Sequence, residues 1–211
     1  MSPRQRGLWL NVLPRVALPS DAARLQHPAD LFTPPAGKVW LEIGFGGGEH
    51  LIWQATHNPN VGLIGCEPFE DGVVKVLSAV DSEGLANIRI RADDGRPLLR
   101  LLPDASIDRA FILFPDPWPK KRHHKRRLVS SETVFELARI VRAGGEVRIA
   151  TDIGEYACAI LLAVLGQGSF RWLAGGPEDW RNRVSDWPQT RYEAKAVREG
   201  RRCYYLRFGR A

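Results

Sequence analysis

Apolar segments of two kinds alternate along this chain, and the alternation limits the folds that it can adopt. Compact apolar runs typical of buried strands are separated by stretches with helical periodicity. The predicted strands are residues 39–43, 61–66, 87–91, 107–114 and 146–150, and the predicted helices are residues 49–57, 69–80, 134–141 and 156–165. Such alternation predicts a mostly parallel sheet with helices on both faces. Two final strands, 170–173 and 202–208, have no crossover helix between them, which predicts an antiparallel addition at one edge.

The length of 211 residues suits one hydrophobic core better than two. We expect a single domain over residues 38–211. An arm over residues 1–37 precedes it, in which the apolar residues between Leu8 and Leu13 form a short helix before Pro14.

The positive charge of the chain is concentrated in one segment. The formal net charge is +6, from 30 Lys and Arg against 24 Asp and Glu. Residues 120–127 contain six of these basic residues and no acidic one, so the rest of the chain has 24 of each. A local basic patch indicates a polyanionic partner more strongly than a diffuse excess does, although a solvated loop has the same composition.

The cysteines Cys66, Cys158 and Cys203 are too few and too far apart for a disulfide framework, and none forms a Cys-x-x-Cys pair typical of zinc sites. The basic start is followed by an apolar stretch that Asn11 and Pro14 interrupt, so a signal peptide is not expected, and no run reaches transmembrane length. We therefore expect a cytoplasmic chain without a metal or a membrane contact. The sequence leaves a monomer and a homodimer both open.

A glycine-rich segment follows the first predicted strand at once. Val39-Trp-Leu-Glu-Ile43 leads into Gly44-Phe-Gly-Gly-Gly48, and the ligands of an open α/β sheet bind at the carboxyl ends of its strands. Without side chains at Gly44, Gly46 and Gly48, the backbone can approach a ligand closely, and its amides are expected to face outward at a helix start. Glycines that only permit tight packing of strand and helix would give the same pattern.

Acidic residues at the strand ends indicate which ligand this is. Glu42 lies within the first strand, and Glu67, Asp94 and Asp116 follow the second, third and fourth. A dinucleotide motif requires glycine where this chain has Glu49, and a pyrophosphate would be repelled by Glu42 and Glu49. A sulfonium cation would not be repelled, and Glu67 can accept both hydroxyls of a ribose. The pattern predicts S-adenosylmethionine, with NAD as the alternative.

The segment after the fourth strand is the predicted acceptor site. Pro115-Asp116-Pro117-Trp118-Pro119 cannot be helical, because proline lacks an amide donor and restricts the residue before it. The Asp116 carboxylate can hold the N1–H and exocyclic amine of guanine, the Trp118 ring can stack, and the adjacent basic residues can bind phosphates. A turn-forming acid and a core or lid aromatic are the alternative roles of these two residues.

The segment Phe114-Pro-Asp-Pro-Trp-Pro-Lys-Lys-Arg-His-His-Lys-Arg-Arg127 resembles the signature of the bacterial tRNA (guanine-N7-)-methyltransferases. Leu41-Glu-Ile-Gly-Phe-Gly-Gly-Gly48, Ala150-Thr-Asp152 and Thr190-Arg-Tyr-Glu193 are similar to other motifs of that family. The resemblance implies an α/β, class I methyltransferase (Rossmann-like) fold, a three-layer sandwich whose seven-stranded, mostly parallel sheet has an antiparallel last strand. It also implies transfer of a methyl group from S-adenosylmethionine to N7 of the variable-loop guanine in tRNA.

The resemblance implies roles for individual residues as well. The cofactor acids of the family fall on Glu42, Glu67, Asp94 and Asp116. Its positions that contact tRNA and guanine fall on Lys120, Asp152, Thr190 and Glu193, and its motif histidine and arginine fall on His123 and Arg126. Family members begin with an Arg-rich arm ahead of the stretch that resembles Pro3-Arg-Gln-Arg-Gly7, whereas this chain starts later.

The expected chemistry is positioning rather than base catalysis. N7 of guanine keeps its lone pair at neutral pH, so no general base is needed to create the nucleophile. We expect Asp116 to be the catalytic residue, because a carboxylate stabilises the positive charge that the base gains. His123 and His124 lie in a cationic run and are expected to contact phosphate or base, with general-base catalysis as the alternative.

Two other functions remain open on the sequence alone. The Asp-Pro-Trp turn is similar to that of methyltransferases acting on exocyclic amines, although those have two prolines after the amide or acid. A non-catalytic RNA-binding protein would share the fold, but it would not need the intact set of glycines and acids. Late in the chain, Trp172, Trp180 and Trp187 lie among arginines, which suits either base stacking or the packing of a long loop against the sheet.

Overall fold

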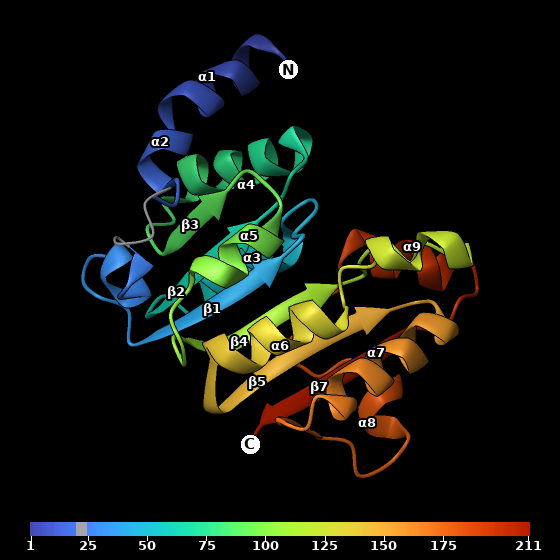
Figure 1. Cartoon of the computed structure of the whole chain (residues 1–211). Coiled ribbons are helices and arrows are strands. Elements are labelled where there is room, and N and C mark those ends of the chain that lie inside the picture. Colours follow the sequence, from blue (N-terminus) through green and yellow to red (C-terminus); the bar gives the residue numbers. More distant parts are fainter. Residues whose placement is uncertain (20–24) are drawn as a thin grey trace.

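The computed structural model describes residues 1–19 and 25–211, and its centre is a seven-stranded sheet of order β3-β2-β1-β4-β5-β7-β6 (Figure 1). The strands are β1 (Lys38–Ile43), β2 (Val61–Cys66), β3 (Ile88–Arg91), β4 (Ile107–Leu113), β5 (Val141–Thr151), β6 (Phe170–Trp172) and β7 (Tyr204–Arg210). β1 to β5 are parallel, β7 is antiparallel to β5, and β6 is antiparallel to β7. The expected parallel sheet with an antiparallel last strand is confirmed.

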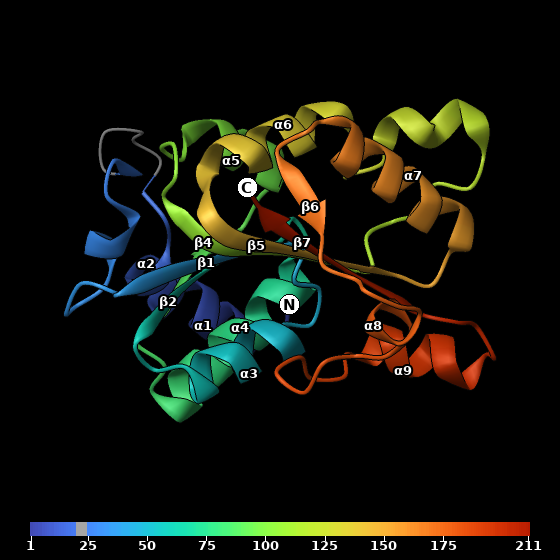
Figure 2. The same cartoon turned by 90° about the horizontal axis from the view of Figure 1, so that it is seen from below.

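Helices cover both faces of the sheet and make three layers (Figure 2). One face carries α5 (Gly95–Leu101), α6 (Ser131–Ile140) and α7 (Gly154–Gly166). The opposite face carries α3 (Glu49–His57), α4 (Glu70–Glu83), α8 (Glu178–Arg181) and α9 (Arg191–Arg198). The other helical segments among the described residues are α1 (Pro3–Asn11), α2 (Leu13–Val16), η2 (Pro28–Leu31) and η3 (Lys121–Arg126).

The two faces of the sheet contribute to two separate cores. Neighbouring residues of a strand point to opposite faces, so Leu41 packs beneath α5 and α6 whereas Trp40 packs with Phe111 on the α3 side. Each large apolar side chain buried in this way contributes about 1.5–3 kcal/mol relative to exposure. Within residues 1–19 and 25–211, none of the helices combines the length and the apolar character needed to cross a bilayer.

Several elements differ from the sequence-based expectations. α5, α8 and α9 were not predicted, because α5 and α8 are short and α9 buries only Glu193 and Ala196. β5 begins at Val141, directly after α6, so Gly144 and Gly145 lie inside a strand and do not terminate the helix. The positive φ of Gly144 (75°) accompanies a register shift in the pairing of β4 with β5, which only glycine tolerates easily.

An ion pair between the buried Arg148 and the half-exposed Asp186 ties the segment between α8 and α9 to the sheet. The Arg148 guanidinium is 2% exposed, and it donates to both carboxylate oxygens of Asp186 at 2.8 and 2.9 Å. Burial alone would raise the pKa of Asp186, but the bonds from Arg148 outweigh it and hold that pKa below its ordinary value. The pKa of Glu146 is lowered in the same way, since Arg148, Arg207 and Arg109 outweigh its burial.

We expect Asp186→Ala to lower the free energy of unfolding by about 2–4 kcal/mol, because it leaves the buried Arg148 with Glu146 as its remaining acidic partner. The pKa of Asp186 is depressed in the folded chain, so its contribution is present above the ordinary value of 3.8 and is lost as the pH falls through the folded pKa. Urea denaturation should therefore show a difference between variant and wild type at neutral pH that shrinks as the pH falls below 3.8. The exposed Asp81→Ala is the control and should change stability by less than about 0.5 kcal/mol.

Candidate functional site at the carboxyl edge of the sheet

A cavity of about 770 Å³ opens at the carboxyl ends of β1 to β4. This volume is within the range of small-molecule sites. Its acidic lining residues are Glu67, Asp71, Asp94 and Asp116, and its basic ones are Arg96, Lys125, Arg126 and Arg191. A lining with equal numbers of acidic and basic residues suits two ligands of opposite charge, one cationic and one anionic.

The turn after β1 is glycine-rich because its backbone packs directly against helix α4. Gly44, Gly46 and Gly48 all have positive φ, at 73°, 54° and 79°. A β-carbon on Gly48 would lie 2.2 Å from Val76 of α4, and one on Gly72 of α4 would lie 2.1 Å from the Gly46 carbonyl oxygen. The glycines therefore permit both the turn and its direct contact with α4.

The amides of this turn are used within the protein, which differs from the expectation that they face a ligand. The Gly44 and Phe45 amides donate to the Cys66 carbonyl, and the Gly48 amide donates to the Phe45 carbonyl. The Gly46 amide donates to Glu67 at 2.7 Å. A pyrophosphate would find few free donors here, so the geometry disfavours the NAD alternative.

The Glu67 side chain joins the glycine turn to the start of α4. It is 4% exposed, and its two oxygens accept hydrogen bonds from the amides of Gly46 and Phe69, at 2.7 and 3.0 Å. Burial raises the pKa of Glu67, the bonds from Phe69 and Gly46 oppose this, and the Asp116 carboxylate raises it further. Asp116 thus acts electrostatically on Glu67 and faces the same cavity from the end of β4.

Asp94 lies at the end of β3 and caps α5. Its side chain accepts from the Arg96 amide at 2.9 Å and lies 3.4 Å from the Arg96 guanidinium. The unpredicted helix α5 therefore explains why an acid stands here: it satisfies an amide at the helix start while it lines the cavity.

The proline-rich turn after β4 is strained at both ends. Phe114 and Trp118 have positive φ, at 52° and 41°, which is uncommon for large side chains. The Trp118 ring lines the cavity, with the Arg126 guanidinium 4.9 Å from its centre and the His123 ring edge-on at 5.9 Å. The turn and η3 thus form one aromatic and cationic wall.

Arg127 closes this wall and differs from the other basic residues of the segment. It is 7% exposed, donates to the Pro117 carbonyl at 2.8 Å, and makes two hydrogen bonds to Glu155 at 3.0 and 2.7 Å. Its guanidinium also lies over the Tyr156 ring. Arg127 is therefore an anchor for the turn, not the free RNA-binding cation that its place in the run suggested.

The start of α9 supplies the opposite wall. Arg191 and Tyr192 line the cavity. A ring carbon of Tyr192 lies 3.1 Å from where a β-carbon on Gly46 would be, and Arg191 lies 3.4 Å from Glu49. The sequence indicated Arg191 only as one of the arginines near the late tryptophans, and it gave no signal for Tyr192, which stands between Thr190 and Glu193.

Several expected site residues lie outside the cavity lining. Thr190 caps α9 through the Glu193 amide, and Glu193 accepts from Arg183 at 2.9 Å and Tyr205 at 2.7 Å, with its other oxygen buried and without a partner. Asp152 accepts from Arg201 at 2.7 Å. Of the expected site residues, the cavity lining includes Gly44, Gly46, Glu67, Asp94, Asp116, Trp118 and Arg126. Its lining does not include Glu42, Gly48, Lys120, His123, Asp152, Thr190 or Glu193.

Glu42 is buried beneath the glycine turn. It is 2% exposed, and its carboxylate lies 2.7 Å from Nδ1 of His50, whose other ring nitrogen lies 3.1 Å from the Gln54 amide. The side chain therefore supports the start of α3 from below and is not in the cavity wall.

The late tryptophans pack against the protein. Trp187 is completely buried and contacts Tyr205 and His50 edge-on, while Trp180 stacks on Tyr204. Trp172 is half-buried against the core. Of the two roles left open by the sequence, the structure favours packing over base stacking. Over residues 1–19 and 25–211 there is also no group of three or more His, Cys, Asp or Glu suited to a metal ion.

Comparison with known proteins identifies the family. A model described as "Putative methyltransferase" matches residues 36–206. A tRNA (guanine-N(7)-)-methyltransferase of Rhodospirillum rubrum is 48% identical over 98% of this chain and 82% of its own length, and one of Roseobacter denitrificans is 52% identical over 88% and 79%. The chain belongs to the tRNA (guanine-N(7)-)-methyltransferase family. The resemblance seen in the sequence is therefore confirmed.

Solved structures place this family member in the same fold as other methyltransferases. An rRNA methylase of Streptococcus thermophilus aligns with a TM-score of 0.56 at 14% identity, covering 100% of this chain and 98% of its own. A 16S rRNA (adenine(1408)-N(1))-methyltransferase of Catenulisporales acidiphilia, solved with its cosubstrate SAM, aligns with a TM-score of 0.57 at 13% identity, covering 92% and 93%. At these identities the likeness is one of fold, and the class I methyltransferase fold is confirmed.

We expect Arg127→Gln and Lys121→Gln to behave differently, although both remove one charge from the basic segment of this family member. Arg127→Gln breaks the bonds to Pro117 and Glu155, so it should lower the melting temperature by a few degrees. The exposed Lys121→Gln should leave the melting temperature unchanged and should lower the salt slope of RNA binding by about 0.7–0.9. Equal melting temperatures for the two variants would contradict the anchoring role of Arg127.

Proposed function

We propose that the chain transfers a methyl group from S-adenosylmethionine to N7 of the variable-loop guanine in tRNA. The observation that carries this proposal is that Asp116 and Trp118 line the same cavity as Glu67 and Asp94. Donor-binding and acceptor-binding groups therefore share one space at the carboxyl edge. The relatives named tRNA (guanine-N(7)-)-methyltransferase support the acceptor.

The donor half of the cavity is the part lined by Gly44, Gly46, Glu67 and Asp94, and its residues fit S-adenosylmethionine. Each oxygen of the Glu67 carboxylate already accepts one amide, which leaves acceptor capacity for a ribose hydroxyl. Gly44 and Gly46 leave the adjacent wall free of side chains, and Asp94 adds a second carboxylate. The donor supplies an electrophilic methyl group on a sulfonium. Glu42 and Gly48 act from below by holding the glycine turn against α3 and α4.

The acceptor half needs to hold a base and to stabilise charge. Asp116 accepts the N1–H and exocyclic amine of guanine, and Trp118 provides a stacking surface. N7 has an available lone pair at neutral pH, so Asp116 acts by orienting the base and by stabilising its developing positive charge, without removing a proton. His123 packs against Trp118, which suits a positioning role better than general-base catalysis.

The remaining predicted positions act on the RNA or on α9. Lys120 and Arg126 bind phosphates beside the cavity. Thr190 and Glu193 hold α9 so that Arg191 and Tyr192 stay in the cavity wall, and Asp152 fixes the far end through Arg201. A tRNA substrate and three free cysteines also suit the cytoplasm.

The proposed function is tested by incubating the chain with labelled S-adenosylmethionine and unmodified tRNA. We expect label in N7-methylguanosine, found by nucleoside analysis and by aniline cleavage at the variable loop. Label in an exocyclic amine would favour the alternative acceptor. Donor binding by calorimetry without any transfer would favour a non-catalytic RNA-binding protein.

We expect Asp116→Ala to lower turnover by about 10²-fold or more while tRNA binding changes little, since the carboxylate acts on the transition state. The matched control is Asp71→Ala, which removes an acid of the same cavity that comes from α4. Single-turnover rates and tRNA dissociation constants should be measured for both variants. Equal losses of turnover and tRNA affinity in Asp116→Ala would contradict the positioning role.

A further inference from the structure

α9 carries a row of exposed cations that begins at the cavity wall and continues beyond it. Arg191, Lys195 and Arg198 are spaced i, i+4 and i+7, so they lie on one face of the helix. All three are exposed. In the described part of the chain, Arg191 pairs with Glu49, whereas Lys195 and Arg198 have no acidic partner within ion-pair distance. We call these three residues the α9 stripe.

The helix that carries the α9 stripe is fixed at both ends. Thr190 caps its first turn, and the buried Glu193 accepts hydrogen bonds from Arg183 and Tyr205. Arg201, just beyond the helix, donates to Asp152 at 2.7 Å. The helix backbone that carries the cations is thus already ordered. Binding of a ligand to these cations therefore costs little conformational entropy of the helix.

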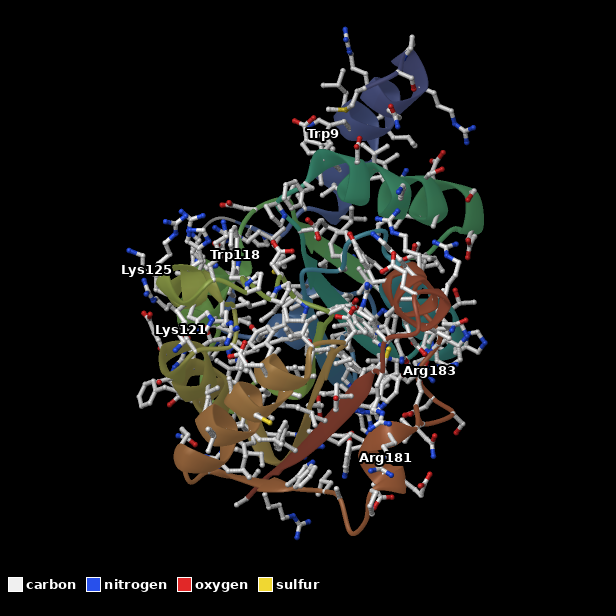
Figure 3. The ribbon with its side chains drawn as sticks, turned by 90° about the vertical axis from the view of Figure 1, so that its right-hand side faces the viewer. Trp9, Trp118, Lys121, Lys125, Arg181 and Arg183 are labelled. Atoms are coloured by element: carbon white, nitrogen blue, oxygen red, sulfur yellow. The ribbon has the colours of Figure 1, made fainter. Side chains whose placement is uncertain are left out.

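The α9 stripe begins at the cavity and lies across from the other basic segment. Arg191 is part of the cavity wall, as are Lys125 and Arg126 of η3. Figure 2 shows η3 on the α6 and α7 side of the sheet and α9 on the opposite side. Figure 3 looks onto the carboxyl edge, with Lys121 and Lys125 on one side and Arg183, next to α9, on the other. Two cationic surfaces therefore flank one cavity.

We propose that the α9 stripe binds the phosphate backbone of the RNA on the side of the target nucleotide opposite to η3. This inference rests on the proposed function. A nucleotide held in a cavity is joined to a chain that enters and a chain that leaves, and both carry phosphates. One basic segment covers only one of these two paths. From Arg191 to Arg198 the helix rises about 10.5 Å, which matches about three nucleotides at about 3.4 Å per nucleotide of a strand.

The alternative is that these cations are only solvated. Exposed charges on a helix commonly contribute nothing beyond solubility, and Glu199 lies one turn after Lys195. Glu199 is however paired with Arg201, so it does not neutralise the stripe. Helix α9 therefore presents a net positive face beside a cavity whose lining carries acidic and basic residues in equal number.

The test compares two double variants of the full chain. Lys195→Gln/Arg198→Gln removes two charges of the α9 stripe and leaves Arg191 in the cavity wall. Lys38→Gln/Arg171→Gln removes two exposed charges from the opposite, amino edge of the sheet. Binding to an unmodified tRNA transcript is measured over a range of salt concentrations, together with donor affinity by calorimetry and the melting temperature.

We expect the α9 variant to lower the slope of log K against log salt by about 1.4–1.8, since each phosphate contact contributes about 0.7–0.9. Its donor affinity and melting temperature should match the wild type, and the control variant should keep the wild-type slope. If the slope of log K against log salt for Lys195→Gln/Arg198→Gln equals that of the control variant, the inference is overturned. This outcome is distinct from failure of the proposed function, which would appear as a wild-type chain that forms no N7-methylguanosine.

Discussion

The contact between the glycine turn and the first turn of α4 determines the geometry of the site. Gly46 and Gly72 touch through backbone atoms alone, and Gly48 leaves room for Val76. This close approach brings the Gly46 amide within 2.7 Å of Glu67, which in turn holds the start of α4. A side chain in the contact would separate the two elements and open the cavity on this side. Glu67 is therefore positioned by backbone packing.

The opposite wall depends on an interaction between residues that are not part of the cavity lining. Arg148, in the middle of β5, holds Asp186, whose carbonyl also accepts from Gln54 of α3. The next residue, Trp187, is then fully buried, and its carbonyl accepts from Arg183. This chain of contacts sets where α9 begins. The cavity thus lies between one wall fixed by glycine packing and another fixed by the ion pair of Arg148 with Asp186.

The sequence predicted most of the sheet and half of the site. Periodicity located the strands because each is a short apolar run, and parallel strands necessarily bring Glu67, Asp94 and Asp116 to one edge. The role of Arg127 could not be predicted, since nothing in a run of six basic residues distinguishes the one whose partner is Glu155. Tyr192 was missed because its partner, Gly46, is distant in the chain.

Local chemistry by itself determined the alternation of strands and helices, the acids at the strand ends, the rigid proline turn and the location of the excess charge. These depend on residue type and spacing, which are fully present in the chain. Only the tertiary structure decided that the amides of the glycine turn are occupied, that Glu42 is buried against His50, and that α9 lies across the cavity from η3. Each of these depends on a partner from a distant segment, and packing of the whole sheet selects that partner.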